Sequence, residues 1–124
     1  MIGYVTLGTN DLARATSFYD ALLAELGAKR FMENDQFVAW ATGPDQPALS
    51  VTKPYDGLKA TVGNGVMVAL TAADAATVDR VHGRALELGG TDEGAPGPRG
   101  EGFYAGYFRD LDGNKLNVFH FRPE

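Results

Sequence analysis

Two halves of this sequence repeat one pattern, and the repeat constrains the fold more than any other feature. In the first half, a strand-like apolar run at residues 3–7 leads through Asp11 into a segment whose apolar residues recur at helical spacing. In the second half, the run at residues 65–70 leads through Asp74 into a similar segment, and both segments end in Leu-Gly. The two aspartates lie 63 positions apart (74 − 11), about half of the 124 residues. The chain is therefore predicted to contain two copies of one module.

Each copy is predicted to continue with three short strands after its helix. In the first copy these strands are expected near residues 28–33, 36–42 and 48–53. In the second copy, residues 94–102 are too rich in glycine and proline for a continuous strand, whereas residues 103–109 pair with residues 116–122 across an Asp-Leu-Asp-Gly turn. The fold class is then α+β, with two βαβββ modules. Each helix covers one face of a curled mixed sheet, and the other faces form a concave cleft.

Length and composition predict one domain that binds neither nucleic acid nor membranes. Residues 1–124 form this domain, with modules at about 1–53 and 65–124 and a linker at 54–64. The formal net charge is −5 and no basic block is present, which disfavours nucleic-acid binding. No apolar run approaches the ~20 residues needed to span a bilayer. The chain has no cysteine, which excludes disulfides and thiolate chemistry and suits a cytoplasmic location.

Two motifs resemble the opening and closing motifs of the vicinal-oxygen-chelate superfamily, which groups glyoxalases, bleomycin-resistance proteins, extradiol dioxygenases and fosfomycin-resistance enzymes. The motifs are the runs at residues 5–23 and 107–116. In the turn of the closing motif, the family usually has proline where this chain has Leu111. With the paired modules, the resemblance covers essentially the whole chain. It implies the two-module fold, and it leaves the activity open because the superfamily hosts several chemistries and some binders with none.

The resemblance also implies where a metal would bind. Catalytic members place histidines and acidic or polar residues at four symmetric positions, which map here onto Tyr4, Ser50, Met67 and Asn117. These neutral groups are poor ligands for divalent metals that prefer imidazole and carboxylate. The usual metal is therefore predicted to be absent, and no cofactor is expected.

The two histidines are predicted to be structural residues and do not supply an alternative metal site. His82 is predicted to be a solvated or half-buried surface residue of the second helix. His120 lies three residues from Asn117 on the last strand, so it faces the opposite side of the sheet. Trp40, the only tryptophan, is expected to be a core residue of the third strand.

The predicted cleft is lined by aromatic side chains with a few hydroxyls and one amide. By strand alternation, its residues are expected to be Tyr4, Thr6, Ser50, Met67, Tyr104, Phe108, Asn117 and Phe119. The Gly- and Pro-rich segment could carry Arg99 over the cleft as a mobile lid, with a surface loop as the alternative. Such a surface is typical of a site for a flat or apolar small molecule.

Three functional classes follow. The preferred one is a metal-free binder of a small molecule, of the bleomycin-resistance type and acting as a homodimer. The second is an enzyme: a glyoxalase-like lyase or a dioxygenase-type enzyme with an atypical or misplaced metal site, or a metal-free catalyst with Tyr4 as acid/base. A phenol with an ordinary pKa near 10 is a poor base at neutral pH, so this last version needs a shifted pKa of Tyr4. The third is a degenerate scaffold, or one subunit of a larger assembly, whose cleft is filled by its own side chains.

Overall fold

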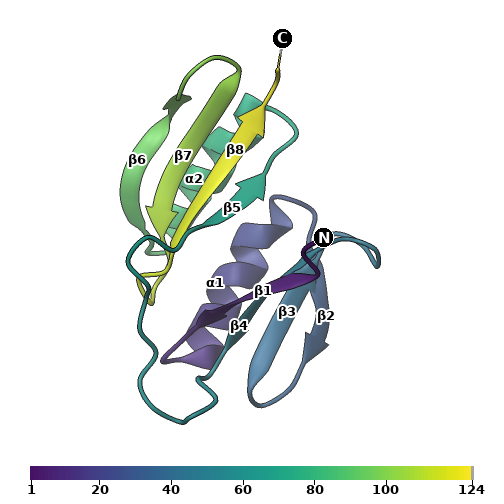
Figure 1. Cartoon of the computed structure of the whole chain (residues 1–124), viewed down its shortest axis with the longest axis vertical. Helices are drawn as coiled ribbons and strands as arrows, with labels where there is room; N and C mark the ends of the chain where they lie inside the picture. Colours follow the sequence, from purple (N-terminus) through teal and green to yellow (C-terminus); the bar gives the residue numbers. More distant parts are fainter. Residues whose placement is uncertain (124) are drawn as a thin grey trace.

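The computed structural model describes residues 1–123 and contains two βαβββ modules (Figure 1). The first module consists of β1 (Tyr4–Gly8), α1 (Leu12–Ala24), β2 (Lys29–Glu33), β3 (Phe37–Ala41) and β4 (Ala48–Thr52). The second consists of β5 (Val68–Thr71), α2 (Ala75–Glu87), β6 (Thr91–Pro98), β7 (Phe103–Arg109) and β8 (Lys115–Phe121). The predicted α+β class and the duplicated βαβββ pattern are confirmed. No helix in the described residues is long and apolar enough to cross a membrane.

The two helices begin and end with the same signals, which explains the repeat in the sequence. The Asp11 side chain accepts a hydrogen bond from the Arg14 backbone N–H at 3.0 Å, and Asp74 does the same for Thr77 at 2.8 Å. Each carboxylate satisfies a backbone donor that the first helical turn leaves free. After each helix a glycine adopts a positive φ, 78° at Gly27 and 100° at Gly89, so the chain can turn back towards the sheet.

Each module has its own four-stranded sheet. The strand orders are β1-β4-β3-β2 and β5-β8-β7-β6, and no strand of one sheet is hydrogen-bonded to a strand of the other within residues 1–123. In both sheets the first strand runs parallel to the last, and the other neighbours are antiparallel. Figure 1 shows α1 and α2 behind their sheets, so the view looks onto the two faces that the helices leave uncovered. Strands β1 and β5 are free edges.

The hydrophobic core lies between each helix and its sheet. In the first module Phe18 and Leu22 of α1 meet Trp40 and Val51 of the sheet, and all four are fully buried or nearly so. The Trp40 indole N–H donates to Asp20 at 2.8 Å, which satisfies the one polar atom of this core residue. In the second module Val78, Val81, Phe108, Leu116 and Val118 are buried, and they belong to the same continuous hydrophobic cluster as the core residues of the first module. Burial of each such side chain contributes about 1.5–3 kcal/mol to folding.

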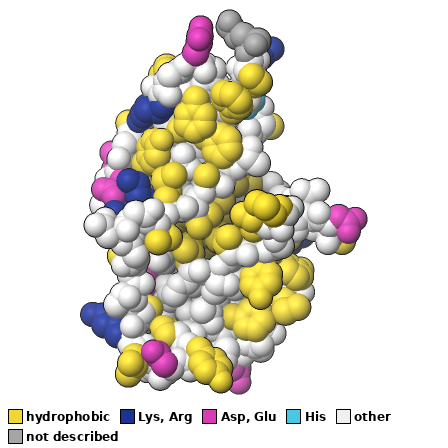
Figure 2. Space-filling view, in the orientation of Figure 1, with side chains coloured by type: hydrophobic (Ala, Val, Ile, Leu, Met, Phe, Trp, Pro, Cys, Tyr) yellow, Lys and Arg dark blue, Asp and Glu magenta, His cyan; other side chains and the backbone are white. Residues whose placement is uncertain are grey.

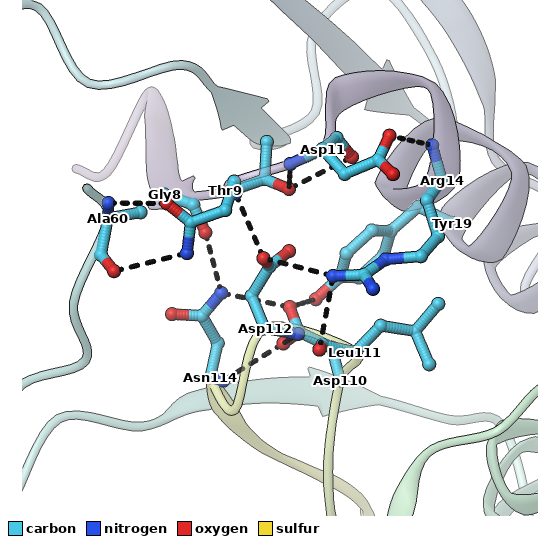
Figure 3. A network of polar contacts seen from close by, with 11 residues as sticks. Gly8, Thr9, Asp11, Arg14, Tyr19, Ala60, Asp110, Leu111, Asp112 and Asn114 are labelled. Atoms are coloured by element: carbon cyan, nitrogen blue, oxygen red, sulfur yellow. Dashed lines mark hydrogen bonds and ion pairs between the residues drawn. The ribbon is translucent and has the colours of Figure 1, made fainter. Parts of the chain in front are cut away.

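A buried polar network joins the two modules (Figure 3). The Tyr19 hydroxyl of α1 donates to Asp110, in the turn between β7 and β8, at 2.6 Å. The Asn114 side-chain amide donates at 3.0 Å both to Asp110 and to the Gly8 carbonyl of β1. Burial, and next the Asp110 carboxylate, raise the pKa of the Tyr19 phenol, so that phenol stays a donor at neutral pH. The turn of one module is thereby fixed to the helix and first strand of the other.

Strand β6 differs from the prediction of an interrupted segment at residues 94–102. The residues up to Pro98 are a strand paired with β7, and only the part after Pro98 is a turn. The pairing shifts its register between Asp92 and Gly94 and again between Gly94 and Gly97. These irregularities accommodate the glycines and prolines because β6 is an edge strand, where a missing backbone donor does not break a central ladder.

His82 also differs from the prediction of a solvated or half-buried residue, which is wrong. The residue is 5% exposed. The ring Nε2 lies 3.1 Å from an Asp92 carboxylate oxygen and 3.2 Å from the Tyr107 carbonyl oxygen. Gly106 makes room for the ring, since a Cβ there would lie 3.1 Å from His82 Cδ2. The imidazole therefore ties α2 to its sheet and has a structural role.

Candidate functional site

The uncovered face of the first sheet carries the predicted residues Tyr4, Thr6 and Ser50. Thr6 lies opposite Ser50, and Ser50 lies opposite Ala39, so these side chains share one face. Tyr4 shares it by alternation along β1 and is 71% exposed, whereas Ser50 is 4% exposed among small neighbours. The face is thus a shallow surface with a serine at its centre and an exposed phenol at its edge.

The uncovered face of the second sheet carries Asn117 and Phe119, as predicted, but not Tyr104 and Phe108. Strand β7 pairs with β8 so that Tyr107 lies opposite Asn117. Tyr104 and Phe108 therefore face α2, and their assignment to the cleft is wrong. The cause is the length of the turn: the Asp110 N–H donates to the Asn114 carbonyl at 2.9 Å, which pairs odd-numbered residues of β7 with odd-numbered residues of β8.

The structure gives Tyr104 and Phe108 other partners. Phe108 has no exposed surface and meets His82 edge-on, with ring centroids 6.4 Å apart. The Tyr104 hydroxyl donates to Asp79 of α2 at 2.7 Å, and this hydrogen bond raises the pKa of the Tyr104 phenol. Both residues belong to the packing of α2 on its sheet. Neither reaches the uncovered face.

An apolar cleft of about 530 Å³ lies between the free edge strands β1 and β5. The first module contributes the start of β1, the end of α1 and the adjoining ends of β3 and β4, and the second module contributes β5 with the residue before it. The walls include Ile2, Val5, Leu26, Trp40, Leu49, Met67 and Leu70. Figure 2 shows the same face of the molecule, where apolar side chains gather over both sheets and in the hollow between them. A volume of this size suits a small organic ligand.

The four positions that the resemblance implies for a metal, Tyr4, Ser50, Met67 and Asn117, do not suit a divalent ion. Tyr4 and Ser50 lie with the first sheet, and Met67 and Asn117 with the second, and the two sheets are not paired. Their oxygen and sulfur donors are uncharged, whereas the divalent ions of this class need imidazole or carboxylate. Over residues 1–123, no group of three or more His, Cys, Asp or Glu side chains could hold an ion.

Two residues at the site were missed by the sequence analysis, Tyr107 and Lys115. The Tyr107 ring lies on the uncovered face of the second sheet, with the Lys115 ammonium 5.7 Å from its centroid and the Arg99 guanidinium 5.6 Å from it. Arg99, considered as part of a lid, follows β6 directly and donates to the Ala95 carbonyl at 2.7 Å. Its guanidinium therefore already lies at the uncovered face. A hairpin turn of five residues, from Asp110 to Asn114, pairs Tyr107 with Asn117. Reading the turn at that length would have placed Tyr107 on the uncovered face.

Comparison with known proteins gives the family. The sequence model of the Glyoxalase/Bleomycin resistance protein/Dioxygenase superfamily matches residues 1–118. Among solved structures, a glyoxalase/bleomycin resistance protein from Albidiferax ferrireducens T118 is 35% identical, with a TM-score of 0.90 and 99% of each chain covered. A hypothetical protein from S. aureus is 25% identical, with a TM-score of 0.74, 97% of this chain and 92% of that chain covered.

A lactoylglutathione lyase from Agrobacterium tumefaciens has the same fold at 23% identity, with a TM-score of 0.71, 97% of this chain and 92% of that chain covered. That likeness concerns the fold alone. No curated protein matches the chain. The match over residues 1–118, together with 35% identity to a solved relative along the whole chain, is decisive. This chain belongs to the Glyoxalase/Bleomycin resistance protein/Dioxygenase superfamily.

Proposed function

We propose that the protein binds a small organic molecule at its uncovered sheet faces without using the divalent metal of its catalytic relatives. The observation that carries this proposal is Asn117. Its side chain is 2% exposed, it points to the uncovered face of the second sheet, and its Oδ1 atom has no hydrogen-bond partner in the described chain. A buried acceptor without a partner is unfavourable by about 1–3 kcal/mol, so a ligand that supplies a donor would recover that energy.

The alternative is an enzyme of the glyoxalase-like lyase or dioxygenase type with an atypical metal site. It is less favoured because the donor set at the four family positions is uncharged. A metal-free version with Tyr4 as acid/base is also less favoured, because Tyr4 is 71% exposed at the edge of the sheet face. At such an exposed position, water rather than protein groups would stabilise a charge that develops on the phenol during the reaction.

Elemental analysis and a thermal-shift screen test the two readings together. Purified protein is expected to contain no stoichiometric Fe, Mn, Ni or Zn, and its melting temperature is expected not to change with EDTA. Organic ligands that bind only the folded state raise the melting temperature, by the equivalent of about 2.7 kcal/mol at a hundredfold excess over Kd. Asn117→Ala should reduce that rise, while Asn64→Ala, in the linker, should not. A stoichiometric metal whose removal abolishes ligand binding would establish the enzyme alternative instead.

We also propose that the protein forms a homodimer through its free edge strands. Strands β1 and β5 have unpaired backbone groups on one side, and apolar side chains near them are exposed, with Ile2 at 56% and Met67 at 41%. A second copy would cover both features. Light scattering after gel filtration should give twice the chain mass. Met67→Glu should give the single-chain mass, whereas Leu58→Glu, at an exposed linker position, should leave the dimer intact. A monomeric unmodified protein would contradict the proposal.

A further inference from the structure

Two cations flank one aromatic ring on the uncovered face of the second sheet. The Arg99 guanidinium and the Lys115 ammonium lie 5.6 Å and 5.7 Å from the centroid of the Tyr107 ring. Neither cation has an acidic partner within residues 1–123, whereas the neighbouring Arg109 is paired with Glu93 at 2.6 Å. The protein has a net charge of −5, so this cationic group differs in sign from the molecule as a whole. Figure 2 shows basic side chains bordering the apolar surface of this module.

Gly97 in β6 leaves room for Arg99 at this position. A Cβ at Gly94 would lie 3.5 Å from one guanidinium nitrogen of Arg99, and a Cβ at Gly97 would lie 3.2 Å from the other. The guanidinium thus lies across two positions without side chains, and it donates to the Ala95 and Pro98 carbonyls at 2.7 and 3.2 Å. These bonds use part of its five donors and hold it in place before any ligand arrives.

Polar and apolar groups follow in order along the same face. Asn117, with its unpartnered Oδ1, lies opposite Tyr107, one step along the face from Lys115. Beyond it, the Phe119 ring stacks on Phe103 with centroids 5.3 Å apart and planes 18° from parallel. Alternation along β8 therefore gives a cation, an acceptor and an aromatic pair in one row. A ligand that matches the row has an anionic end, a hydrogen-bond donor and an apolar body.

We propose that this row binds an amphipathic organic anion. Its carboxylate or similar group lies between Arg99 and Lys115, a hydroxyl or N–H of the ligand donates to Asn117 Oδ1, and its apolar part covers Phe119 and Phe103. The inference rests on the proposed function, because it names the class of ligand that the uncovered face takes. Charge-assisted hydrogen bonds to the two cations supply the selectivity for an anion over a neutral molecule of the same shape.

Two fluorescent probes of nearly equal shape test this inference. 8-Anilinonaphthalene-1-sulfonate carries an anion and an N–H donor on an aromatic body, and N-phenyl-1-naphthylamine is the same molecule without the sulfonate. Titrations at low salt should give tighter binding of the anionic probe. Removing each cation, by Arg99→Gln or Lys115→Gln, should weaken the anionic probe by about tenfold and leave the neutral probe unchanged. Arg84→Gln, on α2 and away from this face, is the control for the same change in net charge.

One result would overturn the anion site alone, and a different result would overturn the proposed function as well. If both probes bind the folded protein and the Arg99 and Lys115 variants bind them as tightly as the unmodified protein, the anion site is overturned and the proposed function stands. If neither probe binds the folded protein, the proposed function fails as well. Circular dichroism of each variant confirms that it is folded, so binding to a partly unfolded chain is not counted.

Discussion

Asp110→Ala is expected to lower the free energy of unfolding by about 3–5 kcal/mol. The Asp110 carboxylate accepts hydrogen bonds from the Tyr19 hydroxyl, the Asn114 side chain and the backbone N–H groups of Asp112 and Asn114. Alanine would leave the Tyr19 hydroxyl and the Asn114 amide buried without this partner, and each such loss costs about 1–3 kcal/mol. The turn would also lose the contacts that fix it to the first module.

Urea unfolding, followed by circular dichroism at pH 7, measures the effect. Tyr19→Phe removes a single donor and should lower the free energy of unfolding by only about 1–2 kcal/mol, because three donors to Asp110 remain. Asp45→Ala, at an exposed turn between β3 and β4, is the matched control and should change it by less than about 0.5 kcal/mol. If Asp110→Ala behaved like Asp45→Ala, the network of Figure 3 would not be what joins the modules.

The duplicated fold could be predicted because its signals are local. An aspartate before each helix and a glycine after it act within one or two turns of chain, and the periodicity between them needs no knowledge of distant residues. The faces of β1 and β4 were also assigned correctly, with Tyr4, Thr6 and Ser50 together. Alternation along each strand was enough there once the family positions had set the register of both strands.

The errors arose where one residue of register or a distant contact decides the outcome. Phe108 was placed on the uncovered face because the turn to β8 was read one residue too short. His82 was read as a surface residue because its burial depends on Gly106, a residue with no periodic signal. The arrangement of the modules depends on contacts between residues far apart in the sequence, such as the bond between Tyr19 and Asp110, which are 91 positions apart. No local pattern contains such information.

Phe108→Ala and Tyr107→Ala, at neighbouring positions of β7, are expected to have opposite effects on stability and binding. Phe108 has no exposed surface and lies in the core beneath α2, so its truncation leaves a cavity and should lower the free energy of unfolding by about 3–5 kcal/mol. Tyr107 is half-buried on the uncovered face, and its ring contacts the two cations, so its loss should lower the free energy of unfolding by about 1 kcal/mol.

The same pair of variants connects the register of β7 to the anion site. Tyr107→Ala removes the ring that Arg99 and Lys115 both contact, so it should weaken the anionic naphthalene probe while the protein stays folded. Phe108→Ala should leave the affinity of the remaining folded protein unchanged, because the ring faces α2. Urea unfolding gives the free energy of unfolding of each variant, and titration gives its affinity for the anionic probe. If Phe108→Ala impaired binding and Tyr107→Ala impaired stability, β7 would be shifted by one residue, and Arg99 and Lys115 would no longer share a ring.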